Sequence, residues 1–321
     1  MFISLNISTL ASNTNRQKDM IFKDKDSKLT KIYFLICKMY QEELKYYCER
    51  FSNNNMPDFT DEEIMTIYLY VMRYEKHVKI KHIHRFAENY LKSWFPKIGS
   101  YQAFDNRLNK LHGAFSRLVE ILITKYQPDD CCLNQNLLDS LPIITCSGKR
   151  SSKVAKEITD KGFCSTKGIF YYGLKMHLLG FRRKGKLPHP EQILYTPASV
   201  NDITVYKQAW CEINNRVFFG DKIYLDIDFN EEIKSKYNSE MLTPVKGVKG
   251  MPDVIKNINK AANDLYSTAV SKVRQPIESL FNWLIEHTDI QKASKVRSTK
   301  GLMVHAFGRL AAAYIILIFN S

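Results

Sequence analysis

The sequence predicts an α/β domain preceded by an all-α domain, and two changes of pattern carry that prediction. Apolar residues recur at helical spacing from residue 29 to about residue 130. From residue 131 the chain turns to runs rich in β-branched and aromatic residues, and it returns to a helical pattern near its end. Strands followed by helices are typical of a sheet with helices packed on it. We therefore expect a polar, mobile arm at residues 1–28, a helical domain at 29–130 and an α/β domain at 131–321.

The helical domain carries recognisable helix starts. Thr60 and Glu63 fit a capping box, in which each side chain accepts a hydrogen bond from the backbone N–H of the other residue. A further helix is expected to start after Ser100. Short consecutive helices with basic outer faces are typical of a helix-turn-helix DNA-binding module, but a plain helical bundle with a solvated basic surface fits the same pattern. The sequence leaves both interpretations open.

Five strands are expected in the α/β domain. The basic run at 182–186 has the composition of a hairpin tip between two of them, whereas the polar, aperiodic segment 147–168 is expected to be a loop. Helices follow the last strand, and the final one passes through the apolar C-terminal run. The candidate strands lie at 133–147, 168–181, 191–199, 216–226 and 240–246.

The composition indicates a basic protein with a packed core. Lys and Arg number 47 against 33 Asp and Glu, which gives a formal charge of +14, and 45% of the residues are apolar. A strongly positive field attracts polyanions, of which nucleic acid is the commonest soluble one. Trp94 and Trp283 are expected in the core, and the place of Trp210 stays open.

The cysteines and the two chain ends argue against zinc-binding, exported and membrane-embedded classes of protein. The seven cysteines are odd in number and lack zinc-ligand spacing, so we expect reduced thiols in the cytoplasm and no structural zinc. The N-terminus lacks a basic start followed by a long apolar run, and the C-terminal run LAAAYIILIF is too short to span a bilayer. We therefore expect neither export nor membrane insertion.

Three acidic residues stand at unusual places in the predicted elements. Asp139 interrupts an apolar strand, where an ionised carboxylate is costly to bury unless a cation or hydrogen-bond donors compensate it. Asp221 follows an apolar strand and a glycine, and Glu278 lies on a helix whose other face is apolar. An Asp after Gly is also a common turn residue, and Glu278 four residues after Arg274 also fits an ordinary surface ion pair.

Together, the three carboxylates have the composition of a metal site. Two aspartates on adjacent strands and a glutamate on a crossing helix are able to hold two divalent ions about 4 Å apart, as in phosphodiester displacement. Mg²⁺ prefers such sparse oxygen ligation, and Mn²⁺ is expected to substitute for it. A basic chain suits the polyanionic substrate of that chemistry.

An ordered set of motifs resembles the DDE transposases of bacterial insertion sequences, most closely the insertion sequence 982 family. The motifs are LLDSLPI, YYGLKMHLL, TPASVND, FFGDKIY, RQPIESLFNWL and ASKVRSTKGLMVHAFGRLAAA, and the likeness runs from about residue 60 to the C-terminus. It implies a ribonuclease H-like catalytic domain at 131–321 with a mixed five-stranded sheet. It also implies that Asp139, Asp221 and Glu278 are the catalytic metal ligands. Two further positions of a broader signature, a tyrosine and a lysine, hold Ser271 and Ile285 here, so those contacts are not transferred.

Other residues of these motifs are supporting candidates, each with a simpler explanation. Asp202 is a second choice for a metal-site carboxylate but also fits a helix N-cap or turn, and His177 fits a packed strand histidine. Basic residues are expected to contact DNA phosphates, although each also fits a solvated surface. They are Lys149, Arg150, Lys153, Lys156, Lys222, Arg274, Lys292 and Lys295.

The predicted function is that of a Mg²⁺-dependent transposase that cleaves at the ends of its element and transfers the freed 3′-hydroxyl to target DNA. Its partner is double-stranded DNA, with a homodimer in the synaptic complex and a location in the bacterial cytoplasm, at the nucleoid. Two alternatives stay open. One is a metal-dependent nuclease of the same fold that never joins strands, and the other is a non-catalytic DNA-binding protein derived from a transposase.

Overall fold

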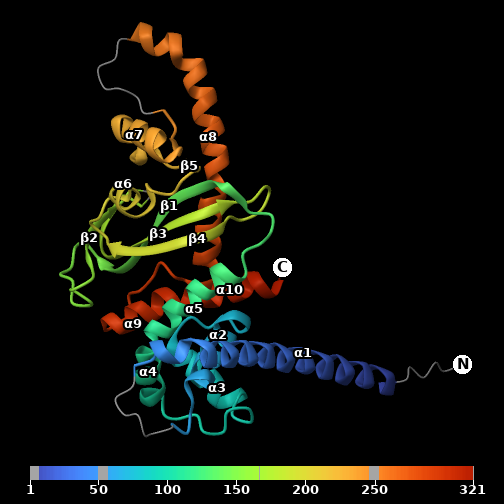
Figure 1. Ribbon diagram of the computed structural model, residues 1–321. Coiled ribbons are helices and arrows are strands. Elements are labelled where there is room, and N and C mark those ends of the chain that lie inside the picture. Colours follow the sequence, from blue (N-terminus) through green and yellow to red (C-terminus); the bar gives the residue numbers. More distant parts are fainter. Residues whose placement is uncertain (1–6, 50–56, 166, 246–252, 321) are drawn as a thin grey trace, which may run out of the picture. The chain divides into compact units, whose positions relative to one another are not determined.

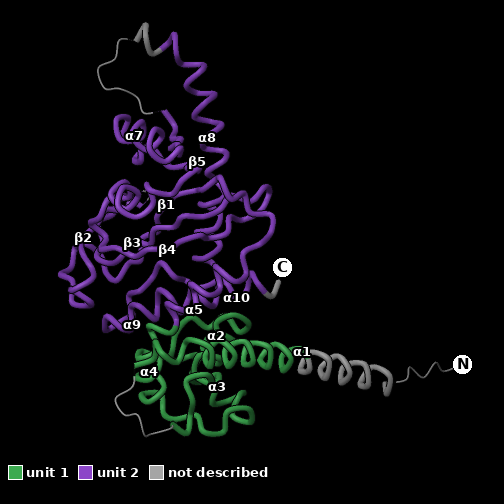
Figure 2. Tube along the Cα trace, in the orientation of Figure 1, with its two compact units in different colours: residues 1–114 green, residues 115–321 purple. Residues whose placement is uncertain are grey.

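The computed structural model describes residues 7–49, 57–165, 167–245 and 253–320. The chain divides into two compact units, residues 1–114 and 115–321 (Figure 2). The boundary between the units lies inside helix α5 (His112–Lys125), earlier than the expected boundary at residue 130. The later part of α5 belongs to the second unit. There the Ile123 carbonyl contacts His189 Nε2 at 2.7 Å.

The first unit is helical, as expected. It contains α1 (Ile7–Glu42), the 3₁₀ turn η1 (Leu44–Tyr47), α2 (Asp61–Tyr74), α3 (Ile80–Tyr90) and α4 (Tyr101–Lys110). The capping box is confirmed, since Thr60 accepts from the Glu63 backbone and donates its own N–H to the Glu63 carboxylate at 2.7 Å. Ser100 caps α4 by accepting from the Ala103 backbone. Helix α1 includes residues 7–28 of the expected arm, and the mobility of that segment stays a prediction.

A buried ion pair holds the helical unit together. The Asp61 side chain is fully buried, and the Arg107 guanidinium donates to both of its carboxylate oxygens at 2.6 Å. The Tyr40 hydroxyl donates to the same carboxylate at 2.8 Å. Helices α1, α2 and α4 therefore meet at one carboxylate whose charge and hydrogen-bonding capacity are matched.

The second unit is built on a mixed sheet of six strands (Figure 1). Strand β3 pairs antiparallel with β1 on one side and with both β2 and β4 on the other. Strands β5 and β6 extend the β1 edge in parallel. The strands are β1 (Cys132–Ser147), β2 (Asp160–Cys164), β3 (Ile169–Arg182), β4 (His189–Pro197), β5 (Val217–Phe219) and β6 (Glu240–Leu242). A strand is present in each of the five expected ranges, and the hairpin tip between β3 and β4 is confirmed. The expected strand 216–226 was too long, because β5 ends at Phe219 and the turn η3 occupies Lys222–Tyr224.

Strand β2 corrects the expectation of a five-stranded sheet and of a loop over 147–168. Its sequence, Asp-Lys-Gly-Phe-Cys, has few strand-forming residues, so it gave no strand signal. Its position depends on Gly162, where a Cβ atom would lie 2.3 Å from the Ala198 carbonyl oxygen. Close backbone approach, rather than strand propensity, places β2 in the sheet.

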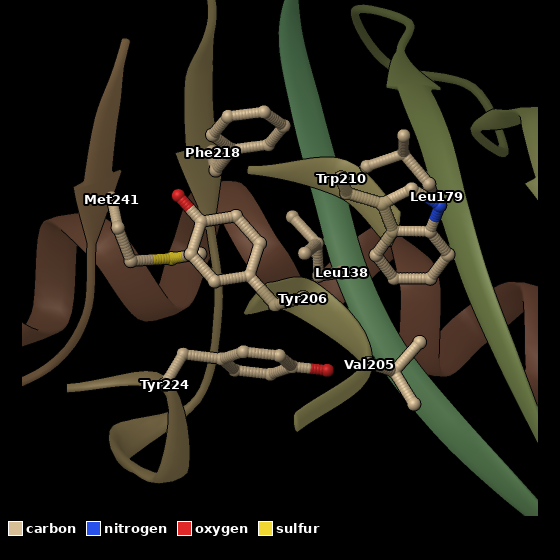
Figure 3. Close-up of a cluster of buried hydrophobic side chains, with 8 residues drawn as sticks. All are labelled: Leu138, Leu179, Val205, Tyr206, Trp210, Phe218, Tyr224 and Met241. Atoms are coloured by element: carbon tan, nitrogen blue, oxygen red, sulfur yellow. The ribbon is translucent and has the colours of Figure 1, made fainter. Parts of the chain in front are cut away.

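Helices cover the sheet, and one face is filled by aromatic side chains. The helix α6 (Asp202–Val205) and the π-helical turn η2 (Tyr206–Trp210) pack with residues of β1, β3, β5 and β6 (Figure 3). Trp210 is fully buried there and donates to Gln192 at 3.0 Å, which settles its place in the core. The cluster comprises Leu138, Leu179, Val205, Tyr206, Trp210, Phe218, Tyr224 and Met241.

The long helix α8 (Asp253–Thr288) contacts β1 and β5. Pro276 lies inside this helix rather than at its start. The remaining elements are η3 (Lys222–Tyr224), α7 (Ile227–Tyr237), α9 (Thr299–Met303), the π-helical turn η4 (Val304–Gly308) and α10 (Arg309–Asn320). The stretch Thr299–Ile318 is by length and composition apolar enough to cross a membrane, but 72% of its most apolar window is buried inside the fold, as in a core helix.

Two of the tryptophan expectations need correction. Trp94 is 46% exposed and not part of the core. Trp283 is half-buried and stacks on His287, with 4.4 Å between the ring centroids. Apolar residues next to each tryptophan are buried, but each tryptophan is itself partly exposed. Residue type alone therefore predicted the wrong position for both side chains.

Candidate active site

Two aspartates follow the point where the pairing of β1 with β5 ends. Strand β5 runs parallel to β1, and their last paired residues are Phe219 and Leu137. Asp139 and Asp221 each come two residues after that pair. Asp139 lies inside β1, still paired with Leu178 of β3, whereas Asp221 lies beyond the end of β5 and caps the turn η3. The two aspartates therefore occupy corresponding places along the two chain segments, one within the sheet and one just outside it.

Helix α8 supplies the third carboxylate. Ile277, Leu280 and Leu284 on this helix are fully buried, which fixes its orientation, while the Glu278 side chain is 50% exposed. Arg274, one turn earlier, reaches back toward β1. Its Nη1 donates to Asp139 Oδ2 at 2.7 Å, and its Nη2 donates to the Glu278 carboxylate. One guanidinium therefore joins the strand carboxylate to the helix carboxylate.

The negative charges of all three acidic groups act on Arg274. Burial lowers the pKa of Arg274, but the negative charges of Asp139, Glu278 and Asp221 outweigh it and raise that pKa. Burial raises the pKa of Asp139 to about 6 against the attraction of Arg274 and a hydrogen bond from the Ser140 backbone N–H. The charges of Asp202 and Glu278 add to the rise. Asp139 is thus a carboxylate whose ionised form depends on nearby positive charge.

Asp202 belongs to a second polar group beside this centre. Its Oδ1 lies 3.1 Å from Lys175 Nζ and 3.4 Å from His177 Nδ1. His177 is fully buried, contacts Thr196 Oγ1 at 2.8 Å through Nε2, and has its pKa lowered to about 4 by burial, with Asp202 opposing that shift. The interpretation of His177 as a packed histidine is confirmed. Asp202 is the first residue of α6 and not its N-cap, which is Asn201.

Apart from Arg274 on α8, the predicted DNA-contacting residues fall into three places. Lys222 is exposed directly after Asp221. Lys292 and Lys295 follow α8, on a segment whose backbone pairs with the distal part of β1, where Ile144 N–H donates to the Gln291 carbonyl at 2.8 Å. The pairing brings that segment close to the start of the basic loop after β1, a proximity that no local sequence signal indicates. The exposed basic residues of this loop are Lys149, Arg150, Lys153 and Lys156.

The donor chemistry suits a divalent cation, but the side chains are not gathered around one point. Two carboxylates bond one guanidinium and the charge of a third acts on it, and hard oxygen ligands of this kind are those that Mg²⁺ prefers. In the described part of the chain, no three Asp, Glu, His or Cys side chains are close enough together to hold a metal as they stand. The ligand types therefore fit a divalent cation, while the Glu278 carboxylate is paired with Arg274.

A basic α/β protein with one acidic residue inside a central strand, a second just after the neighbouring parallel strand, and a third on a helix linked to the first through an arginine has the features of a phosphodiester-processing enzyme. The transposase DDE domain family matches residues 131–299, more than half of the chain. This chain belongs to the transposase DDE domain family and is therefore an enzyme of the nuclease or transposase type. Comparison with curated proteins and with solved structures gave no match.

Proposed function

We propose that this protein is the transposase of a bacterial insertion sequence of the 982 family, with a ribonuclease H-like catalytic domain. The observation that carries the proposal is that Asp139 in β1 and Asp221 after β5 each follow the last paired residues of these parallel strands by two positions, with Glu278 linked to Asp139 through Arg274. The mixed sheet supports the fold assignment, with β2 as an additional strand. In this proposal the protein cuts DNA at the ends of its element and joins the freed 3′-hydroxyl to a target phosphodiester.

Asp139, Asp221 and Glu278 would hold two Mg²⁺ ions, or Mn²⁺ in their place. These ions supply an activated attacking oxygen and stabilise the leaving oxygen. The protein's own residues position that centre. Arg274, which donates to the Asp139 and Glu278 carboxylates, would compensate their negative charge, and its N–H donors also suit a DNA phosphate. Asp202 adds negative charge near Asp139 and is held by Lys175.

The basic surfaces would bind the DNA on which this centre acts. Around the catalytic unit the contacts come from Lys149, Arg150, Lys153, Lys156, Lys222, Lys292 and Lys295. Such phosphate contacts hold DNA without reading its sequence. Reading of the element ends is assigned to the helical unit, where the side chains of four exposed cations on and beside α3 have no partner among the described residues. These are Lys79, Lys81, Arg85 and Lys92.

Two element ends must meet for strand transfer, so a homodimer is expected in the synaptic complex. A transposase of an insertion sequence works on the bacterial chromosome, which assigns the protein to the cytoplasm and the nucleoid. Both assignments rest on the proposed function.

The experiment uses labelled duplex DNA from the flanks of the gene, incubated with the protein and Mg²⁺ or Mn²⁺. Wild type is expected to nick at the flanks and to join them to a second labelled duplex. Asp139→Asn, Asp221→Asn and Glu278→Gln are expected to bind the flanks but to do neither. Glu286→Ala, an exposed acid on the same helix, is the matched control and should act like wild type.

The outcomes separate three functions. Nicking with joining supports a transposase, whereas nicking without joining under every condition indicates a nuclease of the same fold. Binding without nicking in either metal indicates a DNA-binding protein derived from a transposase. An active variant at one of the three carboxylates would remove that residue from the site, and Asp202→Asn would be tested next.

A further inference from the structure

The β2–β3 hairpin displays two phenylalanines on its surface. Phe163 on β2 and Phe170 on β3 are register partners, and they are 52% and 57% exposed. Their rings lie 5.0 Å apart between centroids at an angle of 53°. Gly162 and Cys164 point inward from the same strand. Because side chains alternate between the two faces of a strand, Phe163 and its register partner Phe170 point outward.

The pair is surrounded by positive charge. Lys161 Nζ lies 5.2 Å from the centroid of the Phe170 ring. The loop after β1 is tied to the hairpin, since the Gly148 backbone N–H donates to the Phe170 carbonyl at 2.8 Å. Within the described chain, the exposed side chains of the loop's four cations have no acidic partner, whereas Glu157 is engaged by Thr299 and Asp160 by its own strand. The four cations are Lys149, Arg150, Lys153 and Lys156.

Exposed aromatic rings and unpaired cations on one surface match a particular partner. A cluster of exposed apolar side chains on a folded domain marks a binding surface. A protein or a neutral lipid would cover the rings but not the cations, which favour a polyanion, and DNA is the polyanion that the transposase family implies as a partner. Unstacked nucleobases provide both, because every base has a flat face to stack on an aromatic ring and each nucleotide carries a phosphate.

We propose that Phe163 and Phe170 form a base-stacking platform for unpaired nucleotides of the DNA substrate, with the basic loop holding the adjacent phosphates. The proposal rests on the proposed function, which makes DNA the substrate of this chain. It adds a contact to bases, which the phosphate-binding residues alone do not make. The platform consists of Phe163, Phe170 and Lys161.

The platform's position sets where on the DNA it acts. Phe170 and Leu178 lie on the same face of β3 by alternation, and Leu178 is the register partner of Asp139. The eight residues that separate them at about 3.4 Å each correspond to roughly 27 Å along the strand. Nucleotides of one strand rise about 3.4 Å each, so the platform meets bases about six to eight nucleotides from the cleaved phosphate. Unpairing of the duplex is therefore expected at that distance from the element end.

The test measures binding of a 20-nucleotide oligo(dT) strand and of a matched perfect duplex over a range of salt concentrations. Phe163→Ala and Phe170→Ala are each expected to weaken single-strand binding between about fivefold and a hundredfold. Their duplex binding and their salt slopes should equal those of wild type. Phe163→Leu keeps the apolar contact but not the flat ring, and should bind as weakly as the alanine variant.

Two controls separate stacking from other effects. Phe34→Ala removes an equally exposed phenylalanine, 66% exposed in the helical unit, and should bind like wild type. Lys149→Gln and Lys153→Gln should lower the salt slope on single strands by about 0.7 per residue, which the phenylalanine variants do not. With 5-iodouracil in the strand, irradiation should crosslink wild type at Phe163 or Phe170, located by mass spectrometry.

Several results would overturn the platform. One is single-strand affinity unchanged in both alanine variants, and another is no binding of single strands by wild type. A shift from dimer to monomer in sedimentation, with unchanged affinity for DNA, would assign the pair to contact between two copies of the chain. Flank nicking by wild type is scored separately, so the proposed function stands or falls on its own result.

Discussion

Asp139 should make the metal-free protein less stable as the pH rises. Its pKa is raised from 3.8 to about 6, mainly by burial. At about 1.36 kcal/mol per pKa unit, the rise corresponds to about 3 kcal/mol. Below pH 4 both the folded and the unfolded chain hold the proton, so there is no penalty. Between pH 4 and 6 the unfolded chain releases it first, and above pH 6 the folded chain carries the full cost.

The substitution Asp139→Asn removes this ionisation while keeping a carbonyl oxygen for the hydrogen bond from Arg274. The attraction of Arg274 is already contained in the pKa of about 6, so the rise measures the net cost of ionisation. At pH 7.5 in EDTA, we therefore expect the variant to be more stable than wild type by about 1–3 kcal/mol. The difference should shrink toward zero as the pH is lowered to 4.

The assay is urea unfolding at several pH values, followed by near-ultraviolet circular dichroism from the buried aromatic cluster of the second unit. Asp221→Asn is the matched control. It removes an exposed carboxylate at the neighbouring strand end, so a change below about 0.5 kcal/mol is expected. A variant at position 139 that is less stable than wild type at pH 7.5, or a difference that does not vary with pH, would refute the reasoning.

Three further predictions concern the packing around this site and in the helical unit. Asp61→Ala removes a fully buried carboxylate and leaves the partly exposed Arg107 and the Tyr40 hydroxyl without their acceptor, which should cost about 2–3 kcal/mol in urea unfolding of the helical unit, and a cost below 1 kcal/mol would contradict the role of this pair. Burial lowers the pKa of His177 from 6.5 to about 4, so the folded chain holds this histidine neutral. The resulting stabilisation, at most about 3 kcal/mol, is complete above pH 6.5 and is lost as the pH falls to 4. His177→Gln should therefore show a shallower fall in unfolding free energy between pH 6.5 and 4, and an unchanged slope would count against that account. Trp210→Ala should lower stability by about 3–5 kcal/mol, measured by far-ultraviolet circular dichroism, whereas a loss under 1 kcal/mol would mean that the cluster repacks.

Much of the fold followed from local patterns. The capping box at Thr60 and the starts of the long strands depend on residues near one another in the chain, so the sequence displays them. Strand β2 could not be predicted from local patterns, because Gly162 packs against the backbone of Ala198, which follows a different strand of the sheet. The place of Trp94 also depends on tertiary packing, which residue type does not determine.

The sequence indicated candidate residues for the site but not how they connect. Asp139, Asp221 and Glu278 stood out by interrupting or ending apolar patterns. That Arg274 bridges two of them depends on how α8 crosses β1, which spacing alone does not set. The hairpin platform was missed because an exposed Phe163 looks the same in sequence as a buried one.

The central claim is that the carboxylates hold the catalytic metal, and a change of ligand type tests it most directly. Cysteine thiolate is a poor ligand for Mg²⁺ and a better one for softer Mn²⁺. Flank nicking is measured with Asp221→Cys in each metal, with Asp202→Cys as the control outside the proposed ligand set. The account predicts that Asp221→Cys is inactive in Mg²⁺ and recovers nicking in Mn²⁺, whereas the control shows no such switch. The account would be contradicted if the nicking rate of Asp221→Cys, as a fraction of the wild-type rate, were the same in Mg²⁺ and in Mn²⁺.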